Sequence, residues 1–156
     1  MAAFTDFAEN KLIAWRFRGQ ALGIGDASAA AGSGPTKLYI GLLTVAPTDG
    51  APGTEVSVAG YGRVEVPCTM DAWAGTQGEG TTVASSGSSG TTSNNSAINF
   101  PTPSPDGWGE VKAMGIWDAA TGGNLVIYSA LAVAKVINQG DTVPFPAASL
   151  TFQLDN

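Results

Sequence analysis

The chain is 156 residues long, contains no histidine, and carries 13 acidic against 7 basic side chains, for a net charge of −6. This length suits a single domain with its own hydrophobic core, and 21 glycines with 9 prolines disfavour a mostly helical fold. The acidic balance leaves no basic surface to meet nucleic acid or anionic lipid, so neither is expected as a partner.

The first 19 residues are predicted to form an amphipathic helix. Thr5 or Asp6 is placed to cap its N-terminus, and Asp6 with Glu9 resembles a capping box. Gly19 is a suitable C-terminal cap. Acidic side chains early in the segment and basic ones late in it match the helix dipole.

Apolar side chains cover more than one side of this helix. Ile13 and Phe17 lie off the main stripe, whose members recur at spacings of three and four. The helix therefore has more than one surface to bury, either on its own domain or on a neighbouring subunit. The stripe consists of Phe4, Phe7, Ala8, Leu12 and Trp15. The residues expected to contact a partner are Phe4, Phe7, Leu12, Trp15 and Phe17.

Alanine, glycine and serine dominate residues 20–36, where Asp26 is the only charged side chain. Segments of this composition behave as flexible tethers. We therefore predict an N-terminal arm over residues 1–19, a linker over 20–36, and a β domain over 37–156. The N-terminus is acidic where a secretory signal would be basic and then apolar, so no such signal is expected.

Strand signals begin at Lys37. Residues 38–43 form a continuous apolar run, which is typical of a strand buried on both faces. A turn rich in proline and glycine follows over 46–53. Alternating valines between residues 56 and 66 then predict two more strands, with glycines marking a bend between them.

Serine and threonine dominate residues 78–95, which are predicted to form a loop or an extended hairpin. No charged residue occurs from Gly80 to Pro105. Such a segment either protrudes from the surface or becomes ordered against a partner subunit.

The rest of the chain alternates short apolar segments with turns at intervals of about ten residues. Together with the strands before the loop, they predict a mostly β fold, an antiparallel β-sandwich or jelly-roll-like domain preceded by one helix. The predicted strands cover residues 97–100, 108–118, 124–131, 133–137 and 150–154, with a further one near Phe145.

Little in the sequence supports catalysis or cofactor binding. The absence of histidine removes the commonest general base and metal ligand, and Cys68, which stands alone, is expected to be a buried, inert thiol. Carboxylate pairs could still form a hydrolase site, and Asp118 with Asn124, or Asp49 with Glu55, could bind calcium, but these residues lie in segments typical of turns. No enzyme activity, metal or cofactor is therefore expected. The candidate acids are Asp49, Glu55, Asp71, Asp106 and Asp118.

Several segments, taken in order, resemble a family of small virion proteins of tailed bacteriophages that are often labelled tail-fibre proteins. The resemblance covers nearly the whole chain, and its motifs are structural rather than catalytic. It implies a virion component that is made in the bacterial cytoplasm. The segments are Thr5–Leu12, Leu38–Pro47, Gly53–Val56, Gly60–Val64 and Met114–Leu125.

The predicted function is therefore a non-enzymatic structural protein that assembles with copies of itself and with other virion proteins through its N-terminal arm. Two locations stay open, the tail with its fibres and the capsid, where the protein would act as a decoration or cement protein. An alternative is a module that binds host carbohydrate by stacking sugar rings on Trp73 and Trp108.

Overall fold

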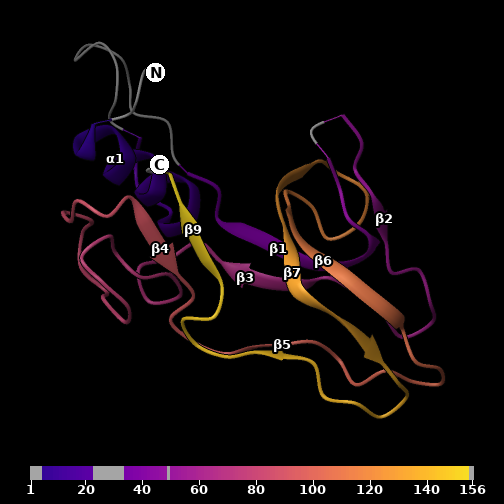
Figure 1. Cartoon of the computed structure of the whole chain (residues 1–156). Coiled ribbons are helices and arrows are strands. Elements are labelled where there is room, and N and C mark those ends of the chain that lie inside the picture. Colours follow the sequence, from indigo (N-terminus) through magenta and orange to yellow (C-terminus); the bar gives the residue numbers. More distant parts are fainter. Residues whose placement is uncertain (1–4, 23–33, 49, 155–156) are drawn as a thin grey trace. The chain divides into compact units, whose positions relative to one another are not determined.

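The computed structural model describes residues 5–22, 34–48 and 50–154. These residues form one N-terminal helix followed by antiparallel strands, so the fold is mostly β, as predicted (Figure 1). The chain divides into two compact units, each assembled from separate segments. Unit 1 comprises Met1–Lys37, Pro67–Ile98 and Phe145–Asn156, and unit 2 comprises Leu38–Val66 and Asn99–Pro144.

The predicted N-terminal helix is α1 (Asp6–Arg18). The Thr5 hydroxyl accepts the N–H of Ala8 at 3.4 Å and so caps the first turn. Gly19 ends the helix with a φ of 64°, a left-handed conformation in which glycine has no steric cost. Both predicted caps are confirmed, because each depends on residues within one turn of the helix end.

Unit 2 contains a five-stranded sheet made of β1 (Lys37–Val45), β2 (Thr54–Glu55), β3 (Val64–Pro67), β6 (Gly109–Trp117) and β7 (Leu125–Ile137). The strand order is β2–β1–β6–β7, and β3 also pairs with β1. β1 pairs with β6 in regular antiparallel register, with Gly41 opposite Gly115. Most side chains of β1 are buried, as expected for a continuous apolar run in the middle of a sheet.

β7 lies at the end of this order, beside β6 (Figure 1). The sequence predicts two strands here, at 124–131 and 133–137, whereas the structure has one strand with an irregular register. Ala130 pairs with Ala113 and Lys135 pairs with Val111. Residues 131–134 therefore stand opposite Lys112 alone and form a bulge, which explains the apparent break in the alternating pattern.

A second correction concerns the Ser/Thr-rich segment 78–95, which is not loop throughout. Its residues Thr91–Ser93 form β4, which pairs antiparallel with β9 (Thr151–Gln153) in unit 1. Thr92 lies opposite Phe152 in this pair. Threonine suits a pleated strand, but the partner lies near the other end of the chain, so local composition alone indicates a loop. A further short pair joins β5 (Ile98–Asn99) to β8 (Pro144–Phe145).

Each unit has an aromatic cluster. In unit 1 the ring of Trp73 lies 5.0 Å from that of Phe17 and 5.8 Å from that of Phe152, measured between centroids. In unit 2 the ring of Trp108 lies 5.2 Å from that of Tyr61 in an edge-to-face arrangement. Trp73 and Trp108 are both buried, and such geometries add to the stabilisation from apolar burial. The sandwich arrangement of the sheets stays a prediction.

Cys68 is buried in unit 1, where its thiol donates to the carbonyl of Arg16 at 3.6 Å. Burial raises the pKa of this thiol to about 11, so it is protonated at neutral pH.

Within the described residues, no helix has the length and apolar character needed to span a bilayer.

Candidate interaction surfaces

One face of α1 is anchored in unit 1. Ile13 and Phe17 are buried, and the ring of Phe17 lies 5.0 Å from that of Trp73 and 5.0 Å from that of Phe152. Full burial of one such side chain contributes roughly 1.5–3 kcal/mol. The helix thus packs on its own unit through the residues that lie off the predicted apolar stripe. Two charged side chains, Glu9 and Arg18, are also buried on it.

Arg18 fastens the Ser/Thr-rich loop to this helix. Its Nε donates to the carbonyl of Trp73 at 3.1 Å, its Nη1 to the Ser85 hydroxyl at 2.8 Å, and its Nη2 to the carbonyl of Val83 at 2.5 Å. Burial lowers the pKa of Arg18 from its ordinary value. Because the guanidinium is buried, each of these bonds replaces hydration that the charge has lost.

Asn10 makes a second connection between α1 and the same loop. Its Nδ2 donates to the carbonyl of Gly87 at 2.9 Å, and its Oδ1 accepts a hydrogen bond from the hydroxyl of Thr76. The Thr76 hydroxyl in turn accepts the N–H of Gly87 at 2.9 Å. The predicted loop therefore takes its shape from polar side chains of the helix and from residues just before it.

The five predicted partner-binding residues differ in burial. Phe4 lies outside the described residues. Phe17 is buried in unit 1, as described above. Leu12 and Trp15 are half-buried, and Phe7 is 61% exposed. Of the described members, Phe7 is therefore the one with most of its apolar surface available.

The predicted linker, 20–36, lies mainly outside the described residues, but the carbonyl of its last residue, Thr36, accepts the N–H of Cys68 at 2.9 Å.

Phe7 borders a groove of about 330 Å³ in unit 1. Lys11 and Ala14 line it from α1, and Ala84 and Ser85 line it from the loop. The Nζ of Lys11 lies 5.7 Å from the centre of the Phe7 ring, which is within cation–π range. An exposed ring beside a concave, mixed apolar and polar surface is a typical arrangement at protein–protein interfaces.

In unit 2, the side chains of Glu55, Tyr61 and Arg63 form a network of hydrogen bonds. The two carboxylate oxygens of Glu55 accept from Nε and Nη2 of Arg63, at 2.8 and 2.7 Å. The Tyr61 hydroxyl donates to Glu55 at 3.0 Å and accepts the N–H of Leu42 at 2.7 Å. Burial of the hydroxyl is the main cause that raises the pKa of Tyr61. A Cβ added at Gly41 would lie 2.9 Å from Glu55 Oε1, so only glycine leaves room for this network.

Arg63 also holds the turn between β6 and β7. Its Nη1 donates to the carbonyls of Ala119 and Gly122, at 2.7 and 2.8 Å, and its guanidinium lies 4.1 Å from the centre of the Trp117 ring. A groove of about 410 Å³ runs beside these residues. Because the donors of Arg63 are engaged by these groups, the arrangement fixes the turn rather than presenting a charge to a ligand.

The candidate acids serve such structural roles where the structure describes their contacts. Glu55 pairs with Arg63, and the carboxylate of Asp118 accepts the N–H of Asn124 at 2.7 Å and its Nδ2 at 2.8 Å. Asp71 and Asp106 are exposed, and Asp49 lies outside the described residues. In the described part of the chain, no group of three His, Cys, Asp or Glu side chains could hold a metal ion.

The suggested carbohydrate site needs a correction. It relies on Trp73 and Trp108 being available to stack on sugar rings, but both are buried in their aromatic clusters. The indole Nε1 of Trp73 donates to the carbonyl of Pro67 at 3.1 Å, which further fixes it inside unit 1. These tryptophans therefore belong to the core, which matches their positions in apolar segments.

Comparison with known protein families shows which family this chain belongs to. None of the curated proteins matches this chain. The family model described as podophage GP4 fiber I protein gp80 matches residues 3–153. This match confirms the resemblance to phage tail-fibre proteins. A structural protein of this kind agrees with the polar networks around Arg18 and Arg63, which stabilise a loop and a turn. Because it covers nearly the whole chain, the protein belongs to the podophage GP4 fiber I protein gp80 family, and is a non-enzymatic structural component of the phage virion fibre.

Proposed function

We propose that this fibre protein assembles with another virion protein through the exposed face of α1, with Phe7 as the central contact. The observation that carries the proposal is the 61% exposure of this phenylalanine on a helix whose other face is buried. Large aromatic side chains are typical anchors at interfaces, where they fill a pocket on the partner.

The helix is well suited to this role because its position is already fixed before any partner binds. Phe17 packs in the core of unit 1, and Arg18 donates to three groups of that unit. A partner would therefore order few additional side chains on binding Phe7, which keeps the entropic cost low. The adjacent groove of about 330 Å³ offers a surface that a protruding side chain of the partner could enter.

The matching family supports the fibre rather than the capsid as the place of this assembly, because it is described as a fibre protein. Decoration of the capsid rests only on general features, namely the size of the chain and its N-terminal helix. The carbohydrate alternative has no support from Trp73 and Trp108, which are buried. We therefore propose attachment within the fibre as the role of α1.

The test is complementation of a phage that lacks this protein with the Phe7→Ala variant. Purified virions are separated into heads and tails, and the amount of the protein in each is measured by quantitative mass spectrometry. Truncation of an interface anchor costs about 2 kcal/mol or more, so incorporation into tails should fall at least roughly tenfold. Val83→Ala is the matched control, because Val83 is also 61% exposed and lies in the same unit.

Phe7→Ala should leave the isolated protein folded, since the ring is mostly exposed and such substitutions change stability little. Unchanged thermal unfolding of both variants establishes this point. Normal incorporation of Phe7→Ala, or an equal loss with Val83→Ala, would show that α1 is not the attachment face. Recovery of the protein only with heads would contradict assembly in the fibre.

A further inference from the structure

In the described structure, β7 forms one edge of the five-stranded sheet of unit 2. In the described part of the chain β7 pairs with β6 alone, on one side. Residues 125–130 contain no charge, glycine or proline, and apolar or aromatic residues make up most of them. Natural proteins usually protect such an edge with charges, prolines or a covering segment, because unpaired N–H and C=O groups attract another strand.

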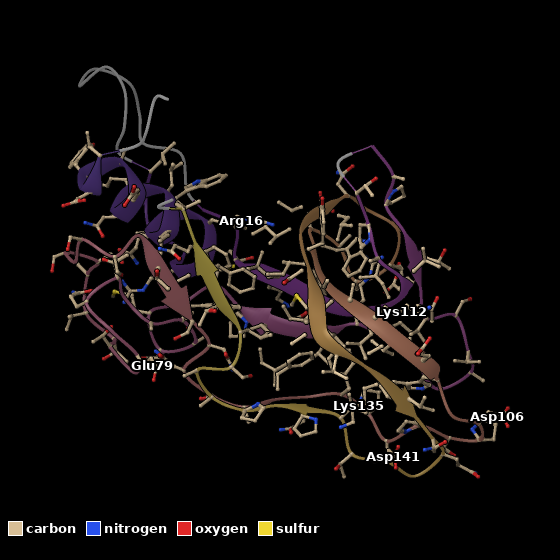
Figure 2. The ribbon with its side chains drawn as sticks, in the orientation of Figure 1. Arg16, Glu79, Asp106, Lys112, Lys135 and Asp141 are labelled. Carbon is tan, nitrogen blue, oxygen red and sulfur yellow. The ribbon has the colours of Figure 1, made fainter. Side chains whose placement is uncertain are left out.

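The side chains along this edge are also unusually exposed for their type. Val126 is 46% exposed and Tyr128 is 38% exposed, and they point to the same face of the sheet because they are two residues apart. The bulge that follows places Val133 outward as well. Lys135 is the only charged residue of β7 and lies near its far end, beyond the bulge (Figure 2).

We propose that residues 125–129 of β7 pair in antiparallel fashion with the same residues of a second copy of this chain, so that two sheets join edge to edge. An antiparallel pair related by a twofold axis is self-complementary. Centred on Ile127, it would place Val126 of each copy opposite Tyr128 of the other, an aromatic and β-branched pair of the kind that stabilises sheets.

The absence of charge on this edge allows a second copy to approach it. Each chain carries a net charge of −6, so two copies repel wherever their acidic surfaces meet. Residues 125–130 are uncharged, and the single lysine of β7 lies outside the paired segment. Two copies can therefore approach along this edge without placing like charges opposite one another. This proposal is independent of the role of α1, because β7 belongs to unit 2 and Phe7 to unit 1.

The first test is sedimentation of the full chain over a wide range of concentration. The wild type should self-associate, and Val126→Lys, which places a lysine opposite Tyr128 twice in the dimer, should weaken association roughly tenfold or more. Val45→Lys is the matched control, because Val45 is 54% exposed in the same unit but lies on β1. Phe7→Ala should leave the association constant unchanged.

The second test examines the pairing directly, with Cys68 replaced by alanine in every chain. A mixture of Val126→Cys and Tyr128→Cys chains should form an intermolecular disulfide on mild oxidation, since directly opposite residues in an antiparallel pair have suitable separations. Either variant alone should cross-link much less. A monomer at all concentrations, equal effects of the lysine variants at 126 and 45, or no preference for the mixed cross-link would each overturn the proposal.

Discussion

The side chain of Arg63 contacts β2, β6 and the turn between β6 and β7. It pairs with Glu55 through two nitrogens, donates to the carbonyls of Ala119 and Gly122, and stacks on Trp117. The side chain of Arg63 is almost fully buried, and that of Glu55 is about one quarter exposed. A planar guanidinium can serve these groups together because its donors form a rigid fork.

Arg63→Met keeps much of the aliphatic stem but removes every one of these interactions. We expect it to lower the free energy of unfolding by roughly 2–4 kcal/mol, because Glu55 is left without its ion-pair partner in a mostly buried position. Urea-induced unfolding, followed by tryptophan fluorescence, measures the change. Lys112→Met is the control, since Lys112 pairs with Glu110 at 3.1 Å on an exposed surface and should contribute about 0–1 kcal/mol.

Equal losses in the two variants would show that burial does not distinguish these two ion pairs. No loss at Arg63 would show that water replaces its partners and that the turn between β6 and β7 holds without it. The second outcome would also contradict the view that the groove beside Arg63 is lined by a structural network.

Sequence reasoning could find only half of this network. Asp118 is recognisable as an acid in a turn segment, which is the role that the structure gives it. Glu55 is recognisable as a structural rather than a catalytic acid, but it lies in β2 and pairs with Arg63 instead of stabilising a turn. Arg63 gives no comparable signal, because its main-chain partners, Ala119 and Gly122, are more than fifty residues away and are recognised through carbonyls that every residue possesses. The same limit applies to Arg18 and its contacts with the loop.

At the scale of elements, α1 and the Ser/Thr-rich loop depend on each other. Arg18 donates three hydrogen bonds within unit 1. Two of the acceptors, the carbonyl of Val83 and the hydroxyl of Ser85, belong to the loop. The loop has few apolar side chains to bury, so these polar contacts supply much of its order. The helix therefore both packs in the core and shapes the loop.

Arg18→Met should release this loop more than it disturbs the rest of the chain. We expect hydrogen exchange at the N–H of Gly87 to accelerate about tenfold or more, while exchange in β1 and β6 changes less, because the methionine still packs where the arginine stem lay. Gln77→Ala is the control, since Gln77 donates to the carbonyl of Ala84 at 2.6 Å in an exposed position that water can occupy. Uniform acceleration in all strands would instead indicate a global loss of stability.

Elements whose signals are local were predictable, and those that rely on distant partners were not. The caps of α1 and the burial of β1 follow from neighbouring residues. β4 and the single, bulged β7 depend on pairing with β9 and β6, which the sequence does not display. The apolar stripe was misleading for a similar reason, because unit 1 provides its aromatic pocket to Phe17, which lies off the stripe.

At the scale of the whole molecule, the two compact units are interleaved along the chain, whereas the predicted arm, linker and domain follow one another in order. Unit 1 takes segments from the beginning, the middle and the end of the chain, and unit 2 takes the two stretches between them. Neither unit can therefore be removed as one continuous piece. Point substitutions on exposed side chains are for this reason better tests of assembly than deletions.

Net charge is the remaining property of the whole molecule that bears on assembly. Thirteen acidic and seven basic side chains give each copy a charge of −6, so free copies repel one another most strongly at low ionic strength. The proposed contact at β7 is uncharged, and the repulsion therefore comes from the rest of the surface. Salt screens charges over a distance that falls from about 30 Å at 0.01 M to about 10 Å at 0.1 M.

Raising the salt concentration from about 0.01 to 0.3 M should therefore strengthen self-association several-fold, because screening removes the repulsion and leaves the uncharged strand pairing nearly intact. Sedimentation equilibrium at a fixed protein concentration measures the change. Val126→Lys, whose strand edge carries a charge, should associate less than the wild type at every salt concentration, although screening should narrow the difference. Association that weakens as salt rises would mean that ion pairs hold the copies together, and would place the contact on a charged surface other than the β7 edge.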